Sequence, residues 1–249
     1  MKLKGKHIAV TGGAGGIGGI LCEHLRAAGA RVSIYDRVDA AGVQHADLSH
    51  LAGITAAGEA MASAAPDIII NLAGLTYFGE FEKESPEHLS ALMHVNLLAP
   101  MLLARAVIPG MKQRGSGMIV NIGSVFGAIP FAYFAAYSAS KAGVRGISDA
   151  LRRELEGTGI AVVHVAPRAV KTALNNAQVM ALAKATNMKM DEPELVVGRI
   201  INAMIAQAPH TVIGFPERLF VRLHGLAPTL IDGGVRKQNH AAKSILHTN

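Results

Sequence analysis

The stretch VTGGAGGIGG, residues 10–19, decides the fold of this chain. It continues an apolar run, HIAV at residues 7–10, that is typical of a buried parallel strand, and it leads into a segment with helical spacing. Gly12, Gly16 and Gly18 are arranged as G-x-x-x-G-x-G. Glycines in such a turn let the backbone approach a pyrophosphate closely, and the start of the following helix stabilises the negative charge. The stretch therefore predicts a strand–turn–helix unit that binds a dinucleotide.

The rest of the chain repeats this alternation of strand and helix. Short runs rich in Val and Ile, typical of buried parallel strands, occur at residues 31–36, 67–74, 117–124, 160–167 and 210–215. The segments between them space their apolar residues as helices do. This order predicts an α/β fold, a single doubly wound Rossmann-type parallel sheet with helices on both faces. Because no Pro-, Gly- or Ser-rich linker divides the chain, we interpret residues 1–249 as a single domain.

Composition narrows the classes of function and the compartment. The formal net charge is +6, but the Lys and Arg residues are scattered without interleaved aromatics, so we expect no nucleic-acid partner. Gly, Asn, Pro or charged residues interrupt every apolar stretch before the roughly 20 residues that a membrane span needs, which predicts a soluble protein. A single cysteine, Cys22, and a start that runs directly into a strand pattern favour the cytoplasm. The eleven histidines lack metal-site spacing, so we expect no metal.

The end of the second predicted strand bears on the choice of cofactor. Asp36 lies there, where a carboxylate can accept hydrogen bonds from the hydroxyls of an adenosine ribose. Its charge repels a 2′-phosphate, which favours NAD over NADP. Arg37 follows immediately and weakens this prediction, because an arginine can accommodate that phosphate.

The stretch YFAAYSASK, residues 133–141, places Tyr137 four residues before Lys141. Residues four apart are neighbours on a helix, so the two side chains are expected to lie close together. A nearby cation favours the charged form of a phenol and lowers its pKa from about 10, so the pair can act in proton transfer. Taken alone, the pair fits equally an ordinary helix surface with one solvated lysine and one half-buried tyrosine.

Together these features resemble the short-chain dehydrogenase/reductase (SDR) family over about residues 5–175. Its T-G-x-x-x-G-I-G pattern matches Thr11 to Gly18, its adenine-binding aspartate matches Asp47 in ADLS, and its N-N-A-G motif matches NLAG, with Leu72 replacing the second asparagine. Gly15 stands where NADP-dependent members often carry a basic residue, a second indication of NAD. The resemblance implies cofactor-binding positions at Thr11, Gly12, Gly16, Ile17, Gly18, Asp36, Arg37, Asp47, Leu48, Asn71, Ala73, Gly74, Tyr137, Lys141, Pro167, Val170 and Thr172.

The resemblance also implies a catalytic group of Asn96, Ser124, Tyr137 and Lys141. In that group Ser124 donates a hydrogen bond to the substrate oxygen and Tyr137 exchanges a proton with it. Lys141 binds the nicotinamide ribose and holds the pKa of Tyr137 down. Asn96 continues the proton path from Lys141 through its backbone and a water.

The substrate region is expected to be apolar. Four aromatic side chains, besides that of Tyr137, gather around the catalytic serine and tyrosine: Phe126, Phe131, Tyr133 and Phe134. Residues 172–192 add several methionines and aliphatic side chains, which suits a substrate lid, although core or subunit packing explains the pattern as well. Arg168 replaces the glycine of the family's P-G pair, so it either pairs with an anionic substrate group or faces solvent, and we favour solvent.

The C-terminal segment, residues 216–249, diverges most from the family. Phe220, Leu223, Ala227 and Leu230 fall on one side of an amphipathic helix. Such a segment can cover the substrate pocket, join subunits or rest on a membrane surface. We expect one of the first two, because Pro228 interrupts the helix.

The sequence as a whole predicts an NAD(H)-dependent enzyme that interconverts a secondary alcohol and a ketone on an apolar, lipid-like substrate. We expect a homodimer or homotetramer, with membrane contact disfavoured. One alternative is an NADPH-dependent reductase of 3-oxoacyl thioesters. An alternative of another class is a dinucleotide-binding sensor or scaffold subunit without catalytic activity, against which the intact Ser124, Tyr137 and Lys141 argue.

Overall fold

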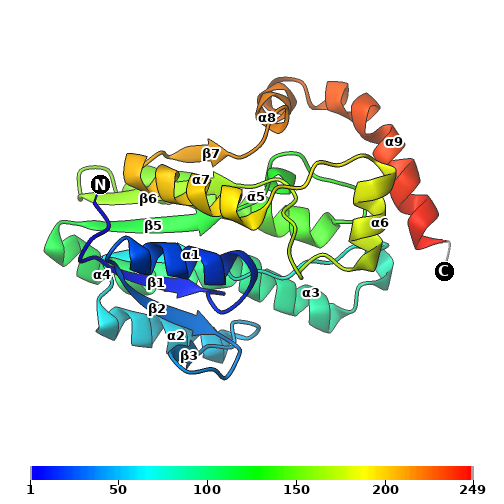
Figure 1. Cartoon of the computed structure of the whole chain (residues 1–249). Coiled ribbons are helices and arrows are strands. Elements are labelled where there is room, and N and C mark those ends of the chain that lie inside the picture. Colours follow the sequence, from blue (N-terminus) through cyan, green and yellow to red (C-terminus); the bar gives the residue numbers. More distant parts are fainter. Residues whose placement is uncertain (1, 248–249) are drawn as a thin grey trace.

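The computed structural model describes residues 2–247, except for the side chains of residues 228 and 230–232 (Figure 1). Its strands are β1 (His7–Thr11), β2 (Arg31–Asp36), β3 (Val43–His45), β4 (Ile68–Asn71), β5 (Gly117–Ile122), β6 (Ile160–Ala166) and β7 (His210–Val212). Its α-helices are α1 (Gly16–Ala27), α2 (Leu51–Ala64), α3 (Pro86–Met93), α4 (Ala99–Arg114), α5 (Ala135–Glu154), α6 (Ala177–Ala185), α7 (Pro193–Ala206), α8 (Glu217–Leu226) and α9 (Pro228–Leu246).

The seven strands form one parallel sheet in the order β3-β2-β1-β4-β5-β6-β7. The order reverses between β1 and β4, where a doubly wound sheet opens its ligand crevice. Helices α1 and α7 pack on one face, around a core that includes Leu21, Ile70 and Ile200. Helices α2, α4 and α5 cover the other face, around residues such as Ile69 and Leu103 (Figure 1). The predicted doubly wound sheet is thus confirmed.

All six predicted strands are present, and β3 is the additional one. Its sequence, Val43-Gln44-His45, has no apolar run, and its side chains are half-buried or exposed at the edge of the sheet. Only pairing with β2 marks it as a strand, which explains why the sequence pattern missed it.

Helices α3 and α4 are joined by a π-helical turn, His94–Leu98, into one continuous stretch from Pro86 to Arg114. By length and composition alone this stretch is long and apolar enough to cross a membrane. Its apolar stripe, however, packs into the core of the protein at Leu92, Leu103 and Met111. Partial burial of this kind is typical of a core helix.

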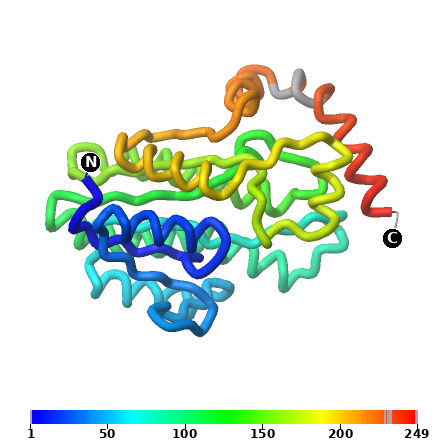
Figure 2. Tube along the Cα trace, viewed as in Figure 1, coloured from blue at the N-terminus to red at the C-terminus, as the bar shows by residue number. Residues whose placement is uncertain are grey.

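The C-terminal part of the chain lies beyond the last strand. Figure 2 shows the chain leaving β7, forming α8 above the sheet and returning as α9 alongside α6. The second half of α9 packs through Ala242 against a small cluster that includes Phe78, Phe134 and Leu182. Helix α8 ends at Leu226 and α9 begins at Pro228, so the helical stretch is interrupted at this proline, as we expected. The side chain of Leu230 lies outside the described residues.

Candidate active site

A cleft of about 650 Å³ runs along the carboxyl ends of the strands. Its walls come from the loops that follow β1, β2, β3, β4, β5 and β6, and from the segment that contains α6. One end is formed by the glycine turn and residues 35–38, and the other by Ser124, Tyr137 and Lys141. The cleft thus joins the predicted dinucleotide loop to the predicted catalytic group.

The glycine turn is built so tightly that side chains are excluded. Gly12 has a φ of +68°, and a Cβ there would lie 2.7 Å from the Cα of Ala73. A Cβ on Gly18 would lie 2.0 Å from the carbonyl oxygen of Gly12. Helix α1 begins at Gly16 without a side-chain cap and without an acidic residue in its first turn, so its positive end faces the cleft. Gly12, Gly16, Ile17 and Gly18 line the cleft, and this turn fits the pyrophosphate of a dinucleotide.

Asp36 lies at the same end of the cleft. Its carboxylate accepts hydrogen bonds from the backbone N–H of Ala14 (3.0 Å) and of Arg37 (2.8 Å), which hold it beside the glycine turn. Arg37, Asp47 and Leu48 also line this end. Hydrogen bonds from Ser49 are the main cause that lowers the pKa of Asp47, so this carboxylate stays ionised at neutral pH. Two carboxylates and one exposed arginine therefore surround the expected adenosine site.

Two predicted cofactor residues, Thr11 and Asn71, lie behind the wall of the cleft. Thr11 Oγ1 accepts hydrogen bonds from the N–H groups of Leu72 (3.1 Å) and Ala73 (3.2 Å). Asn71 is buried, and its Nδ2 donates to Oδ1 of Asn121 at 2.8 Å. Both residues shape the loop that follows β4, whose Ala73 and Gly74 line the cleft, so these two side chains support the wall from behind.

Ser124, Tyr137 and Lys141 come together at the other end of the cleft. Tyr137 lies in the first turn of α5, and Nζ of Lys141 is 5.8 Å from the centre of its ring. Lys141 is buried and donates a hydrogen bond from Nζ to the carbonyl oxygen of Ile122 at 3.0 Å. Ser124 follows β5, and its Oγ accepts from the N–H of Phe126 at 3.1 Å. The structure therefore brings the three predicted side chains to one place.

The protonation of this group differs from the expectation. Burial raises the pKa of Tyr137, and the hydrogen bond with Ser124 only partly opposes this effect. Burial lowers the pKa of Lys141 to about 8. The expected lowering of the tyrosine pKa is therefore not seen, because desolvation disfavours the charged forms of both side chains. Tyr137 is a protonated phenol at neutral pH in this environment.

Asn96, the fourth predicted catalytic residue, has its side chain buried behind the cleft. It lies in the π-helical turn, an arrangement that is frequent at functional sites. Its Oδ1 accepts from the N–H of Leu75 (2.7 Å), and its Nδ2 donates to the carbonyl of Leu75 (2.9 Å) and to Oγ of Ser140 (3.1 Å). Ser140 in turn donates to the carbonyl of Tyr137 (2.7 Å). Asn96 therefore positions the tyrosine through Ser140, a link that the sequence analysis did not identify.

The aromatic group divides into two layers. Phe126 and Phe134 line the cleft, whereas Phe131 and Tyr133 lie behind them. The rings of Phe126 and Phe131 stack at 5.1 Å with an interplanar angle of 7°. The predicted lid contributes five apolar side chains to the opposite wall: Ala173, Leu174, Val179, Leu182 and Met188. Pro167, Val170 and Thr172 complete the wall after β6, as predicted. The wall around the catalytic group is therefore largely apolar, with Arg168, Thr172 and Asn175 as further polar residues.

Arg168 does not face solvent, and its guanidinium group is already paired with carboxylates of the same chain. It makes a bidentate ion pair with Asp191, with Nη2 2.6 Å from Oδ1 and Nε 3.0 Å from Oδ2, and Nη1 lies 3.2 Å from Oε2 of Glu217. Our solvent-facing interpretation was wrong because these partners, 23 and 49 residues further along the chain, meet Arg168 only in the fold. A short parallel bridge between Val170 and Asp191 adds backbone hydrogen bonds at the same place.

These contacts fasten the two ends of the lid, residues 172–192, to each other. Arg168 and the bridge hold the chain just before and at the end of the lid, and Lys171 forms an exposed ion pair with Glu192. Within residues 2–247, excluding undescribed side chains, no group of three or more His, Cys, Asp or Glu is placed to hold a metal ion.

The fold and the cleft define a dinucleotide-binding oxidoreductase. The family model described as short chain dehydrogenase matches residues 6–183, and the chain belongs to this family. It is therefore an enzyme that acts on CH–OH/C=O groups, in a family that binds NAD(P).

Among curated proteins, the chain is similar to the ketoacyl reductase HetN of Nostoc, with 45% identity over 101 residues, 41% of this chain and 35% of that one. It is 32% identical over 220 residues to the 3-oxoacyl-[acyl-carrier-protein] reductase FabG of Vibrio cholerae, covering 80% of this chain and 90% of the relative. It is 30% identical over 207 residues to the D-beta-hydroxybutyrate dehydrogenase of Cupriavidus necator, covering 76% and 80%.

Solved structures with either cofactor resemble this chain. A short-chain dehydrogenase from Sphingobium yanoikuyae in complex with NADPH has a TM-score of 0.75 and 28% identity, covering 91% of this chain and 95% of that one. One from Leptospira borgpetersenii with bound NAD+ has a TM-score of 0.73 and 25% identity, covering 84% and 91%.

Proposed function

We propose that this protein is an NAD(H)-dependent oxidoreductase that interconverts a secondary alcohol and a ketone on an apolar, lipid-like substrate. The observation that carries the proposal is the single cleft that leads from the glycine turn and Asp36 to Ser124, Tyr137 and Lys141. The apolar wall formed by Phe126, Phe134 and the lid supports the substrate class.

The roles of the residues follow from this arrangement. A bound nicotinamide accepts or supplies the hydride. Ser124 donates a hydrogen bond to the substrate oxygen, and Tyr137 gives that oxygen a proton during ketone reduction or takes the proton during alcohol oxidation. The raised pKa of Tyr137 keeps its proton available for reduction at neutral pH. Lys141 contacts the nicotinamide ribose, and Asn96 keeps the tyrosine in place through Ser140.

The choice of NAD rests on the adenosine end of the cleft. The Asp36 carboxylate is fixed beside the glycine turn by two backbone N–H groups, and a 2′-phosphate would approach this charge closely. Gly15 lines the same wall and supplies no cation for such a phosphate.

One alternative is an NADPH-dependent reductase of 3-oxoacyl thioesters. Two observations favour it, the similarity to HetN and FabG and the exposed Arg37 at the adenosine end. Titration of the purified protein with both cofactors separates the two functions. We expect NADH to bind at least about tenfold more tightly, and a clear preference for NADPH would overturn the NAD assignment.

Activity with a panel of secondary alcohols and ketones, including 3-oxoacyl thioesters, tests the substrate class. We expect turnover to rise with the length of the apolar chain. Complete inactivity across the panel with cofactor bound would instead support a sensor or scaffold subunit. For the assembly we propose a homodimer or homotetramer, since members of this family typically form oligomers, and for the compartment the cytoplasm.

A further inference from the structure

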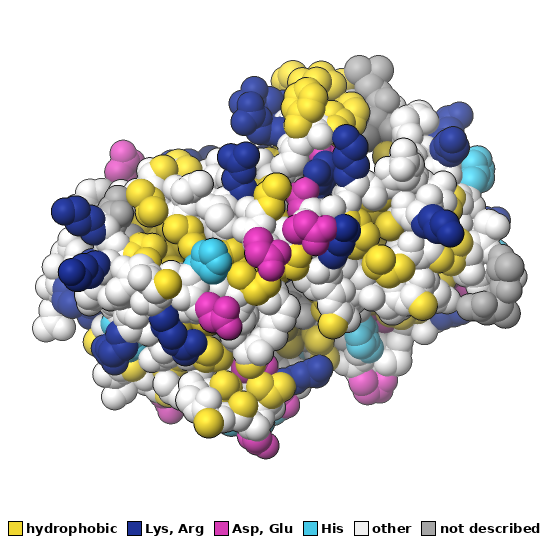
Figure 3. All heavy atoms as spheres, in the orientation of Figure 1, with side chains coloured by type: hydrophobic (Ala, Val, Ile, Leu, Met, Phe, Trp, Pro, Cys, Tyr) yellow, Lys and Arg dark blue, Asp and Glu magenta, His cyan; other side chains and the backbone are white. Residues whose placement is uncertain are grey.

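Helix α8 exposes a row of large apolar side chains. None of its residues 217–226, all of them described, is buried. The exposed fractions are 84% for Leu226, 48% for Leu219, 42% for Phe220 and 40% for Leu223, and Phe215, just before the helix, is 75% exposed. Figure 3 shows these yellow side chains gathered over α8, with Lys and Arg side chains beside them. The helix therefore covers neither the cleft nor the core of its own chain.

The exposed residues form one continuous face. At about 100° per residue, Leu219, Leu223 and Leu226 lie within roughly 60° of one another on the helix, and Phe220 extends this arc to about 120°. Single exposed apolar residues are ordinary on protein surfaces, but a contiguous patch marks a surface that binds something.

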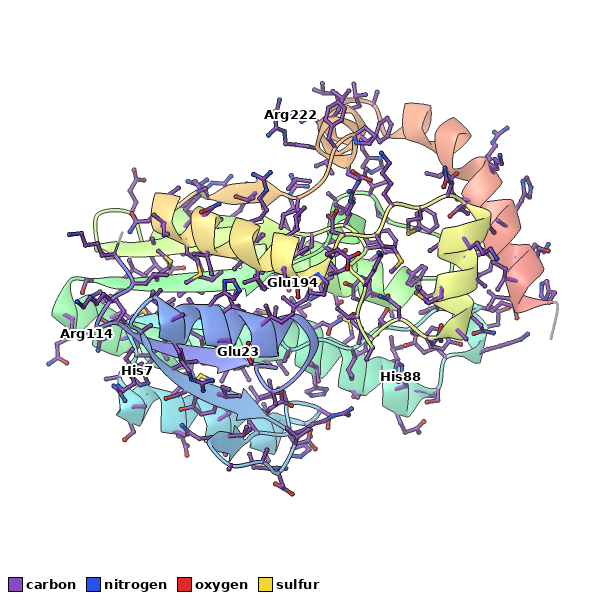
Figure 4. The ribbon with its side chains drawn as sticks, in the orientation of Figure 1. His7, Glu23, His88, Arg114, Glu194 and Arg222 are labelled. Carbon is purple, nitrogen blue, oxygen red and sulfur yellow. The ribbon has the colours of Figure 1, made fainter. Side chains whose placement is uncertain are left out.

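The charges around this face indicate what it binds. Arg218 and Arg222 are both exposed and lie along one border of the apolar arc. Figure 4 shows Arg222 projecting outward from α8, away from the sheet. The one acidic residue of α8, Glu217, is already paired with Arg168. The next helix adds exposed cations at Arg236, Lys237 and Lys243.

Two occupants suit an apolar face, a second copy of the chain or a lipid surface. In an antiparallel two-fold contact between two α8 helices, the arginines of one helix would face those of the other, and like charges at such a contact oppose binding. An anionic bilayer surface complements the same arginines, while the apolar side chains enter the boundary between headgroups and acyl chains.

We propose that α8 docks this protein on the surface of an anionic lipid bilayer, with the helix in the plane of the interface. Phe215, Leu219, Phe220, Leu223 and Leu226 enter the bilayer, and Arg218 and Arg222 contact lipid phosphates. This reverses our preference from the sequence, which expected the apolar side to be covered by protein.

The position of α8 connects docking to the cleft. Glu217 at the start of α8 pairs with Arg168, and Arg168 lines the cleft and holds Asp191 at the end of the lid. Two ion pairs, Glu217–Arg168 and Arg168–Asp191, therefore connect the proposed bilayer-binding helix to the end of the lid. This link to the cleft rests on the apolar substrate proposed above.

Co-sedimentation with vesicles tests the proposal. The full chain is mixed with vesicles of phosphatidylcholine and phosphatidylglycerol in equal parts, or of phosphatidylcholine alone. We expect binding to the anionic vesicles, weakened at high salt. The double variants Leu219→Gln with Leu223→Gln and Arg218→Glu with Arg222→Glu should each reduce the partition coefficient by about tenfold or more.

Matched controls change exposed residues elsewhere. Leu51→Gln with Leu195→Gln removes two side chains that are 55% and 48% exposed on α2 and α7. Arg26→Glu with Arg199→Glu reverses two exposed arginines on α1 and α7. Both controls should bind like the unchanged protein, and no variant should alter turnover of a small water-soluble alcohol.

Two outcomes would overturn the proposal. Absence of vesicle binding by the unchanged protein is one of them. If, in that case, Leu219→Gln with Leu223→Gln lowers the mass of the protein measured by light scattering, α8 is a subunit interface. Equal loss of binding in the control and test variants is the other, since it shows that α8 has no specific part. Neither outcome depends on the cofactor or on the reaction.

Discussion

The two ends of the molecule differ in what fixes them. The dinucleotide half, up to Lys141, is held by close backbone contacts and buried hydrogen bonds, such as those of Gly18 and Asn96. In the substrate half, after β6, α7 packs into the core, but the two ends of the lid are joined by an ion-pair cluster around Arg168, and α8 exposes its apolar face. Tight packing thus surrounds the catalytic group, whereas the lid and α8, which we propose to serve the substrate, have fewer buried contacts.

This contrast matches the requirements of each task. A hydride donor and a proton donor must meet the substrate in one geometry, so small displacements around Tyr137 are costly. A substrate lid, as we propose for residues 172–192, opens and closes, and segments with few buried contacts have the low local stability that this requires. Substitutions in the two halves should therefore fail in different ways.

The largest effect is expected at Tyr137. Replacing it with phenylalanine removes the proton donor, so turnover should fall by about a thousandfold or more, whereas NAD(H) affinity should stay within about twofold. Tyr133→Phe is the matched control, because that ring lies behind the wall of the cleft and should leave turnover nearly unchanged. Initial rates and fluorescence titration with NADH give both numbers. A Tyr137→Phe enzyme with near-normal turnover would refute the proposed role.

The glycine turn should give the next largest effect. A Cβ on Gly18 would lie 2.0 Å from the Gly12 carbonyl oxygen, so Gly18→Ala must shift the turn. NAD(H) affinity should fall by at least about tenfold, and overpacking should cost about 1–3 kcal/mol of unfolding free energy. Gly19→Ala, whose Cβ would meet no atom closer than 4.0 Å, should change neither quantity appreciably. Similar results for both variants would contradict the geometry described for the turn.

Changes in the ion-pair cluster at the base of the lid should affect the substrate half of the molecule without affecting the dinucleotide half. Arg168→Met leaves Asp191 and Glu217 without their cation, and their side chains are 6% and 24% exposed. We expect a loss of about 2–4 kcal/mol in unfolding free energy, measured with denaturant, and a rise in KM for apolar substrates without a change in NAD(H) affinity. Lys171→Gln breaks the exposed pair with Glu192 and should cost less than about 1 kcal/mol. Equal losses in the two variants would show that the buried cluster does not hold the lid.

The smallest effect concerns pH. Burial lowers the pKa of Lys141 from its ordinary 10.5 to about 8, so between these values the unfolded chain binds more protons than the folded one. The folded protein is therefore most stable, as far as Lys141 is concerned, above pH 10.5. Its unfolding free energy decreases as the pH falls to about 8, because the unfolded chain takes up the proton first. The difference between the unchanged protein and Lys141→Met should rise with pH in this window by roughly 1 kcal/mol per unit. A difference independent of pH would mean that Lys141 titrates normally.

The sequence predicted the sheet because buried parallel strands have a strong local pattern. It also located the side chains that carry short motifs, since Ser124, Tyr137 and Lys141 each belong to one. Placement of motif residues was less exact: Thr11 and Asn71 support the wall of the cleft and do not line it. A motif records that a residue type is required, but it does not distinguish a ligand contact from a support.

Contacts between distant segments left no local pattern. Nothing near Arg168 in the sequence indicates Asp191 or Glu217, and each partner lies in a segment with its own polar surface pattern. The exposure of the apolar face of α8 could not be predicted from the sequence either. Amphipathic spacing shows that one face of a helix is apolar, but it does not show what covers that face.

The bridge between Val170 and Asp191 has a consequence for how enzymes of this design diversify. It closes residues 172–190 into a loop whose two ends are fixed next to each other, independently of what lies between them. A loop of another length or composition can be inserted between the same two anchors without disturbing the register of β6. We therefore expect the substrate range to change through this one segment while the catalytic group stays the same.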